Sequence, residues 1–244
     1  MKQVLLKITE NIPLTDNVYK MCLKGDVSAI TAPGQFINIK LEGLFLRRPI
    51  SVCDCRGDTV TIIYKVVGKG TEQMSRMQNG TLDVLTGLGN GYDTSLSGPR
   101  PVLLGGGVGV PPLYMLAKQL LSEGKQVSVV LGFNKKDEVF WEKEFKDLGA
   151  DVTVTTADGS YGVKGFVTDI LPRLDCSYFY TCGPEPMLRA VCKTADCGGQ
   201  LSFEERMGCG FGACMGCSCK TLAGNKLICK EGPVMQKEEI IWDD

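Results

Sequence analysis

Four cysteines in the last part of the chain have the spacing of an iron–sulfur site. Cys209, Cys214 and Cys217 form a C-x4-C-x2-C triplet, and Cys229 follows further along. This is the plant-type thiolate pattern of a [2Fe–2S] cluster. Glycines alternate with the cysteines, and residues without a Cβ let the backbone wrap a cluster closely and turn its amides towards the sulfurs. The spacing therefore predicts a [2Fe–2S] cluster bound by these four thiolates.

Two alternatives for this cysteine segment remain open. A structural zinc ion also binds four thiolates, but zinc sites usually pair two short C-x2–4-C knuckles, whereas this segment has one tight triplet and one distant cysteine. Cys219 is a rival fourth ligand, although it follows Cys217 so closely that the pair would crowd one iron. We expect Cys229 to be the fourth ligand and Cys219 to be a bystander.

Composition excludes several classes of function. The 27 basic and 28 acidic side chains nearly cancel, so neither a nucleic-acid nor an anionic-membrane partner is expected. The chain contains no histidine, which excludes a Rieske centre and histidine acid–base catalysis. Residues 1–10 lack a signal-peptide pattern, and glycines and prolines interrupt the most apolar stretch, 101–117. We expect a cytoplasmic protein whose chemistry is carried by bound cofactors.

The elements that must position these groups change in kind along the chain. Residues 1–97 contain short β-type runs separated by Gly, Pro or Asp-rich breaks, which predict an antiparallel barrel or sandwich. The predicted strands are 4–8, 18–23, 36–41, 50–54 and 60–66. From residue 98, strands alternate with helices, which predicts a parallel sheet covered by helices on both faces. The predicted strands there are 102–104, 127–132, 152–155 and 178–181, and the predicted helices begin near 111, 137, 165 and 186.

The remaining residues, 199–244, are rich in Gly and Cys, and we expect them to depend on the cluster for their order. The sequence therefore predicts an α+β multidomain protein with boundaries at 1–97, 98–198 and 199–244.

Two glycine-containing turns predict a nucleotide site in the parallel-sheet domain. The first follows the initial strand and opens a helix; it contains Gly105, Gly106, Gly107 and Gly109. Such a turn lets the backbone approach a pyrophosphate at a helix N-terminus. The second turn, Cys182-Gly183-Pro184, follows a later strand. Open α/β sheets bind ligands at the carboxyl ends of their strands, so the two turns together predict one site.

The first domain carries two weaker anion-binding signals. Arg48 lies close in sequence to Ser51 of a predicted strand, and an arginine there can hold a phosphate. Gly70 and Thr71 follow another strand in a turn with free amides. The numbers of electrons that the predicted cofactors transfer also favour a flavin site in this domain. Nicotinamide delivers a hydride, whereas a [2Fe–2S] cluster accepts one electron, so a cofactor that handles both must lie between them, and flavin is the common choice.

These motifs occur in the order of the ferredoxin-reductase-like superfamily, and the resemblance covers nearly the whole chain. Within the superfamily the chain is most similar to the family of electron-transfer subunits of dihydroorotate dehydrogenase B. The segment 205–217 is the most specific part of the match. The resemblance implies an FAD-binding antiparallel β-barrel at 1–97, an NAD-binding α/β domain at 98–198 and a small [2Fe–2S] module at 199–244.

The resemblance also implies roles for particular residues. The residues expected to contact FAD are Arg48, Pro49, Ile50, Ser51, Ile63, Tyr64, Lys65, Gly70 and Thr71. Those expected to frame NAD(H) are Gly105, Gly106, Gly107, Gly109, Gly183 and Pro184. Cys182 is expected to lie beside the nicotinamide as the catalytic residue. The segment 132–138 offers both acidic and basic side chains, so the residues alone leave NAD and NADP open.

The implied function is electron transfer within a larger enzyme. Electrons would pass between NAD(H), FAD and the cluster, to or from FMN in a dihydroorotate dehydrogenase catalytic subunit of pyrimidine biosynthesis. The resemblance implies a heterotetramer of two chains of each kind. The alternatives are a ferredoxin:NADP reductase or hydrogenase diaphorase subunit with the same cofactors, and a zinc-stapled protein without catalysis.

Overall fold

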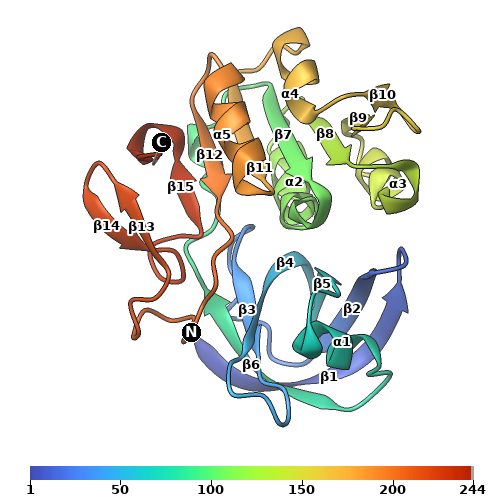
Figure 1. Ribbon diagram of the computed structural model, residues 1–244, viewed down its shortest axis with the longest axis vertical. Coiled ribbons are helices and arrows are strands. Elements are labelled where there is room, and N and C mark those ends of the chain that lie inside the picture. Colours follow the sequence, from blue (N-terminus) through green and yellow to red (C-terminus); the bar gives the residue numbers. More distant parts are fainter. Residues whose placement is uncertain (243–244) are drawn as a thin grey trace.

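The structure, a computed structural model, describes residues 1–242. Figure 1 shows a β-barrel at the bottom, an α/β domain at the top and a small hairpin at the side. Six antiparallel strands close the barrel in the order β1-β2-β5-β4-β3-β6. Their bounds are β1 Lys2–Pro13, β2 Val18–Lys24, β3 Phe36–Ile39, β4 Arg48–Arg56, β5 Thr59–Lys65 and β6 Thr81–Leu88, with α1 Lys69–Ser75 between the last two.

The barrel closes because the long strand β1 pairs with both β2 and β6. The register of β1 against β2 shifts between Ile8 and Glu10, an irregularity of the kind that bends a strand. Aliphatic side chains such as Leu6, Ile37 and Ile62 fill the interior. This confirms the predicted antiparallel barrel. Strand β6 is absent from the predicted strands, because Asp83 and Gly87 interrupt its β-type pattern.

The α/β domain is built on a seven-stranded sheet with the order β10-β9-β8-β7-β11-β12-β15. All neighbouring strands are parallel except β12 and β15. The strands are β7 Pro101–Gly106, β8 Ser128–Phe133, β9 Asp151–Thr156, β10 Val163–Lys164, β11 Tyr178–Cys182, β12 Gly199–Ser202 and β15 Val234–Gln236. The helices are α2 Pro112–Ser122, α3 Glu142–Asp147, α4 Val167–Ile170 and α5 Glu185–Thr194. Short 3₁₀ turns are η1 Thr94–Leu96, η2 Gly107–Gly109, η3 Lys136–Glu138, η4 Leu171–Arg173 and η5 Lys237–Glu239.

Side chains alternate between the two faces of this sheet, as the period of a strand requires. Leu103 and Val129 pack with α2 and α3 on one face, whereas Val102 and Val130 pack with α4 and α5 on the other. The predicted parallel sheet with helices on both faces is therefore confirmed. The predicted helix near 137–148 is shorter in the structure, because its first turn is the separate η3.

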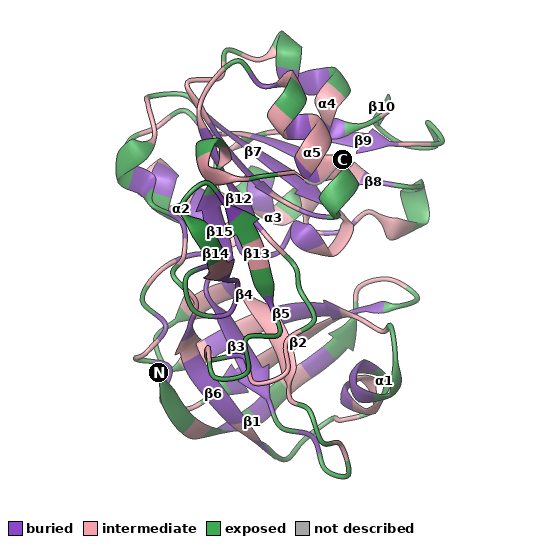
Figure 2. Cartoon of the chain, turned by 60° about the vertical axis from the view of Figure 1, so that its left-hand side comes forward, coloured by how far each residue is buried: buried purple, intermediate pink, exposed green. Residues whose placement is uncertain are grey.

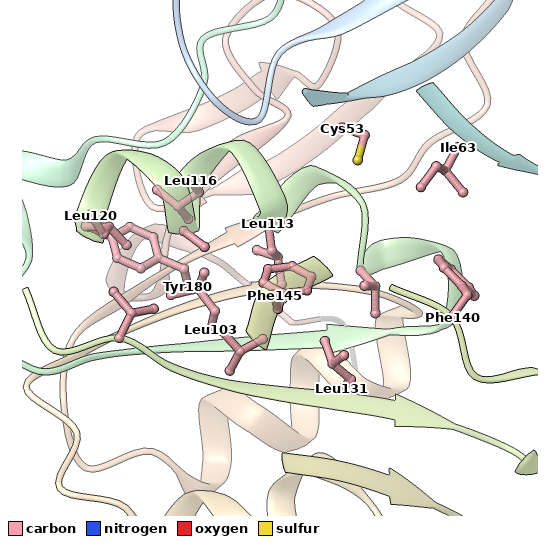
Figure 3. Close-up of a cluster of buried hydrophobic side chains, with 14 of the residues drawn as sticks. Cys53, Ile63, Leu103, Leu113, Leu116, Leu120, Leu131, Phe140, Phe145 and Tyr180 are labelled. Atoms are coloured by element: carbon pink, nitrogen blue, oxygen red, sulfur yellow. The ribbon is translucent and has the colours of Figure 1, made fainter. Parts of the chain in front are cut away.

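One apolar core joins the barrel to the α/β domain. Cys53 of β4 and Ile63 of β5 belong to the same buried cluster as Leu113 of α2. Figure 3 shows Cys53 and Ile63 on the barrel side of the junction and Leu113 on the side of the α/β domain. Beside this core, Lys118 Nζ lies 2.6 Å and 2.8 Å from the two carboxylate oxygens of Asp54. The junction therefore fixes the ends of β4 and β5 relative to the glycine turn after β7.

The C-terminal segment packs against both of the preceding domains. Its hairpin, β13 Ser218–Thr221 and β14 Gly224–Leu227, stands beside the sheet (Figure 2). Ile228 and Cys229 are buried against Phe36 and Leu88 of the barrel. β12 begins at residue 199, directly after the predicted boundary, and it pairs with β11 of the α/β sheet. Parts of the predicted module thus continue the sheet, and its exact limits stay a prediction. Among residues 1–242, no helix has the length and apolarity to cross a bilayer.

Candidate functional site

A cavity of about 250 Å³ opens where the barrel, the α/β domain and the C-terminal segment meet. It brings together residues predicted from separate motifs of the barrel: Arg48, Pro49, Ile50, Ser51, Ile63, Tyr64, Lys65 and Thr71. From the other two parts of the chain come, among others, Gly109, Cys182, Gly183, Met207 and Pro233. We call this space the junction cavity. It forms because β4 and β5 are antiparallel neighbours, so the start of β4 and the end of β5 lie at the same side of the barrel.

Arg48 crosses the start of α1 at the edge of this cavity. A Cβ on Gly70 would lie only 2.1 Å from Arg48 Nε, so only a glycine at this position leaves room for the arginine. Gly70 does not itself line the cavity. The Thr71 hydroxyl accepts from the N–H of Val67 at 2.9 Å and donates to the carbonyl of Gly68 at 3.1 Å. The hydroxyl therefore shapes the turn, and Arg48 supplies the positive charge.

A buried polar chain fixes α1 against the barrel. The Tyr64 hydroxyl donates to Asn11 Oδ1 at 3.0 Å, and Asn11 Nδ2 donates to the carbonyls of Met74 and Met77 at 2.8 Å. Burial raises the pKa of Tyr64 to about 12, so the phenol is neutral at physiological pH. The Tyr64 ring stacks on Tyr19 with 5.9 Å between centroids. Tyr64 thus provides an apolar wall and holds the Gly70–Thr71 turn in place.

A second cavity of about 560 Å³ lies at the carboxyl ends of the parallel strands. Of the predicted nucleotide residues, it is lined by Gly106, Gly107, Gly109, Gly183 and Pro184. Gly105 lies beneath the turn, where a Cβ would come within 2.9 Å of Val110 Cγ2. We call this space the sheet-edge cavity. Its place agrees with the rule that open α/β sheets bind ligands at their carboxyl edge.

The two cavities meet along one seam. Both are lined by Lys65, Val108, Gly109, Gly183 and Glu204. Ligands in the two cavities would therefore lie next to each other, which is the arrangement that hydride transfer between two ring systems requires.

Gly109 and Cys182 make the closest backbone approach at this seam. A Cβ on Gly109 would lie 2.2 Å from the carbonyl oxygen of Cys182. Burial raises the pKa of the Cys182 thiol to about 12, although a hydrogen bond with Ser202 opposes the shift. The thiol is therefore protonated at neutral pH, and it cannot act there as a thiolate nucleophile.

The four cysteines predicted to bind the cluster fall into two pairs. Cys209 Sγ accepts from the N–H groups of Phe211 at 3.5 Å and Ala213 at 3.2 Å, and it contacts the Cys214 side chain. Burial raises the pKa of Cys209, but the N–H groups of Phe211, Cys214 and Ala213 outweigh burial and lower it to about 6. Backbone amides that point at this sulfur favour its thiolate form, which is the form that binds iron.

The second pair is Cys217 and Cys229, both buried. Cys217 Sγ accepts from the N–H of Cys229 at 3.4 Å, and the Gly212 N–H donates to the Cys229 sulfur. The last bond ties the loop of the first pair to the second. Within residues 1–242, no three Cys, Asp or Glu side chains converge as ligands of one metal ion do. Two thiol pairs fit two irons with two thiolates each, better than they fit a single zinc.

Cys219 lies apart from these pairs, on β13, where it is aligned with Lys226 of β14. Its sulfur lies 3.7 Å from the carbonyl oxygen of Lys220. This placement agrees with its predicted role as a bystander, which stays a prediction.

Sequence reasoning missed Asn38, which connects the barrel to the cluster loop. Asn38 is 1% exposed on β3, and its Nδ2 donates to the carbonyl of Cys209 at 3.1 Å. Gly210, with φ of +80°, passes so closely that a Cβ would lie 2.3 Å from that Nδ2. The only signal in the sequence is a polar residue within the apolar run Phe36-Ile-Asn-Ile. Asn38 holds the first cluster pair against the barrel.

Comparisons with known proteins agree with this arrangement. Residues 204–241 match the iron–sulfur cluster binding domain of dihydroorotate dehydrogenase B, and residues 103–193 match the oxidoreductase NAD-binding domain. A relative from Bacillus pumilus, the electron transfer subunit of dihydroorotate dehydrogenase B (NAD(+)), is 44% identical, with 98% of each chain covered. The relative of the same name from Fusobacterium nucleatum is also 44% identical, with 96% of each chain covered.

Solved structures show the same fold. A chain of an NADH-dependent reduced ferredoxin–NADP oxidoreductase superposes with a TM-score of 0.88 at 30% identity, covering 99% of this chain and 91% of that one. A ferredoxin NADP+ reductase from Neisseria gonorrhoeae superposes with a TM-score of 0.70 at 18% identity, covering 80% and 90%. The full-length relatives and the matched domains together place this chain in the family of dihydroorotate dehydrogenase B electron transfer subunits.

Proposed function

We propose that this chain passes electrons between NAD(H), FAD and a [2Fe–2S] cluster, to or from FMN in a dihydroorotate dehydrogenase catalytic subunit. A bound flavin exchanges hydride with nicotinamide and single electrons with an iron–sulfur cluster. The observation that carries the proposal is the position of the junction cavity. It shares a seam with the sheet-edge cavity, and it also reaches Met207 and Pro233 of the cysteine-rich segment.

The residues around the junction cavity fit a flavin dinucleotide. Ile63 and Tyr64 supply apolar wall, Lys65 lies at the seam, and Arg48 provides charge for a pyrophosphate. Pro49, Ile50 and Ser51 continue along the same strand, and Gly70 with Thr71 forms the turn beside Arg48. These residues would hold FAD and exclude water from its ring.

The sheet-edge cavity fits NAD(H). Its glycine turn after β7 would receive the pyrophosphate, and Gly183 with Pro184 would place the nicotinamide at the seam. The protonated Cys182 thiol would pack beside the reacting rings as a neutral wall. The two cysteine pairs, Cys209 with Cys214 and Cys217 with Cys229, would hold one iron each.

Oxidation of dihydroorotate needs a second subunit. The residues of the first two domains already form the two nucleotide cavities. An FMN-binding (β/α)8 barrel would need about 250 further residues, so it must belong to another subunit. We propose a cytoplasmic heterotetramer with two chains of each kind and the domain limits 1–97, 98–198 and 199–244. A second candidate function is a ferredoxin:NADP reductase or hydrogenase diaphorase subunit. The TM-score of 0.88 with the ferredoxin–NADP oxidoreductase chain supports this second candidate.

Co-purification separates these two candidates. A tag on this chain should recover a yellow FMN protein with dihydroorotate dehydrogenase activity in equal molar amount. Recovery of a ferredoxin-dependent or hydrogenase partner in its place would favour the alternative.

Arg48→Ala should weaken the retention of FAD. A charge-assisted hydrogen bond to a phosphate contributes about 1.5–3 kcal/mol, so the dissociation constant should rise by roughly 10- to 150-fold. The measurement is FAD titration into flavin-stripped protein, followed by fluorescence quenching. Arg56→Ala, an exposed arginine at the other end of the same strand, is the matched control and should bind FAD normally. Equal FAD affinity in both variants would show that Arg48 does not hold the phosphate.

A further inference from the structure

Two cysteines outside the predicted cluster site have their sulfur atoms in contact. Cys176 Sγ lies 3.0 Å from Cys197 Sγ, although the two residues are 21 positions apart in the chain. Both side chains are half-buried, and both thiols are free. A disulfide joins its two sulfurs at about 2.05 Å, so a movement of about 1 Å would be enough to form one. Electron transfer between the two cavities and the cluster makes no use of this pair.

The parallel pairing of β11 with β12 brings these two cysteines together. Each cysteine lies two residues before its strand, and the register sets Phe179 opposite Gly199. The same register, continued back by two residues, sets position 177 opposite Cys197, so Cys176 is offset by one position. Two positions with this offset on neighbouring strands lie roughly 6 Å apart, which is within the range of Cα separations that a disulfide spans.

Hydrogen bonds hold the backbone beside each sulfur. The Ser177 N–H donates to the Arg100 carbonyl at 3.0 Å, and Ser177 Oγ accepts from the Arg100 N–H at 3.0 Å. On the other side of the pair, Lys237 Nζ donates to the carbonyls of Ala195 at 2.7 Å and of Cys197 at 3.3 Å. Both segments are therefore tied to neighbouring parts of the chain, which keeps the two thiols facing each other.

The surroundings of the pair give the two thiols different roles. Burial, and next the contact with the Cys197 sulfur, raise the pKa of the Cys176 thiol well above its usual value. The thiolate of Cys176 is therefore scarce at neutral pH, and the thiolate is the form that attacks an oxidant. Cys197 is accordingly the thiol that attacks first, and Cys176 is the thiol that completes the bond.

We propose that Cys176 and Cys197 form an oxidation site, in which a peroxide converts the two thiols into a reversible disulfide that joins β11 to β12. The Cys197 thiolate attacks one peroxide oxygen, the O–O bond breaks, and a sulfenic acid and one water result. Cys176 then attacks the sulfenic sulfur, the S–S bond forms, the S–O bond breaks, and a second water leaves. Two thiols are thus oxidised by two electrons, hydrogen peroxide is reduced to two waters, and these waters take up the two thiol protons.

The disulfide would act on stability and not on turnover. It would close a covalent ring around β11, the turn at 182–184 and α5, and such a ring restricts the unfolded chain. The melting temperature should therefore rise by at least about 4 °C. The pair lies at the amino ends of the two strands, whereas the sheet-edge cavity is at the carboxyl ends, and neither cysteine lines a cavity. The kcat/KM for NADH should not change.

Peptide mapping of the full-length chain tests the site directly. Anaerobically purified protein is treated with hydrogen peroxide, its remaining thiols are blocked with iodoacetamide, and it is digested with trypsin. Cleavage after Lys and Arg places Cys176, Cys192 and Cys197 in the separate peptides 174–189, 190–193 and 194–206. Mass spectrometry should find peptides 174–189 and 194–206 joined, with two hydrogens fewer than their sum. Dithiothreitol should separate them.

Three variants identify the sulfurs. Peptide 174–189 also contains Cys182, so Cys176→Ser shows which of its two thiols reacts. Cys176→Ser and Cys197→Ser should lose the link, whereas Cys192→Ser, which changes a thiol beside the same apolar core, should keep it. Peroxide should raise the melting temperature of Cys192→Ser above that of Cys176→Ser treated in the same way. Peptides that stay separate, or a link that survives in Cys176→Ser, would overturn the site. A link without the rise in melting temperature would overturn its stabilising role.

Discussion

Replacing Cys209, Cys214, Cys217 or Cys229 by serine, one at a time, is expected to abolish the [2Fe–2S] cluster. Serine is a hard oxygen donor of high pKa, whereas iron–sulfur clusters are held by thiolates. The pairing would make each loss severe, because each iron would have only two protein ligands. The measurement is iron and acid-labile sulfide in purified protein, which should fall from about two of each per chain to near zero.

Cys219→Ser is the matched control for these variants, because it changes a thiol in the same segment. Its side chain lies on β13, and we expect full iron content and an unchanged visible spectrum. If Cys229→Ser retained iron and Cys219→Ser lost it, Cys219 would be the fourth ligand and Cys229 the bystander. Zinc in place of iron in the anaerobically purified, unaltered protein would contradict the cluster itself.

Gly109→Ala is expected to lower NADH oxidation by at least about 100-fold, because misplacing a bound substrate by about 1 Å can cost that much. The new Cβ would lie 2.2 Å from the Cys182 carbonyl oxygen, so one of the two backbones must shift at the seam between the cavities. The assay is kcat/KM for NADH with ferricyanide. Iron content should not change, since the cysteine pairs are elsewhere in the chain.

Gly68→Ala is the control for the change from glycine to alanine. Gly68 has an extended backbone with φ of 179°, and a Cβ there meets no atom within 4 Å. This variant should oxidise NADH at the normal rate. Normal kcat/KM in Gly109→Ala would mean that the seam is not where nicotinamide reacts.

The architecture was largely predictable because its signals are local. Short β-type runs gave the barrel, and strand–helix alternation gave the parallel sheet, since each pattern follows from which side chains must be buried. The iron–sulfur site was predictable for the same reason, because the cysteine spacing that indicates it lies within one short segment. The limits of the last domain were harder to infer, because β12 and β15 come from the cysteine-rich end of the chain and extend the preceding sheet. Pairing between distant segments leaves no local pattern.

The candidate site was predictable only in part, for the same reason. The predicted flavin residues are spread over β4, β5 and the turn at α1, yet all except Gly70 line one cavity. Asn38 escaped prediction, because its importance depends on what lies opposite it in space. Asn38 meets the Cys209 carbonyl across 171 positions of sequence.

The most direct test of the central claim compares this chain alone with the complex recovered through it. The measured reaction is oxidation of dihydroorotate coupled to reduction of NAD+. The isolated chain, loaded with FAD and cluster, should oxidise NADH with ferricyanide but should not oxidise dihydroorotate. Addition of the FMN-containing catalytic subunit should establish NAD+-dependent dihydroorotate oxidation, and the Cys217→Ser variant should not support it. Dihydroorotate oxidation by the isolated chain, or full coupled activity with the cluster-free variant, would contradict the account.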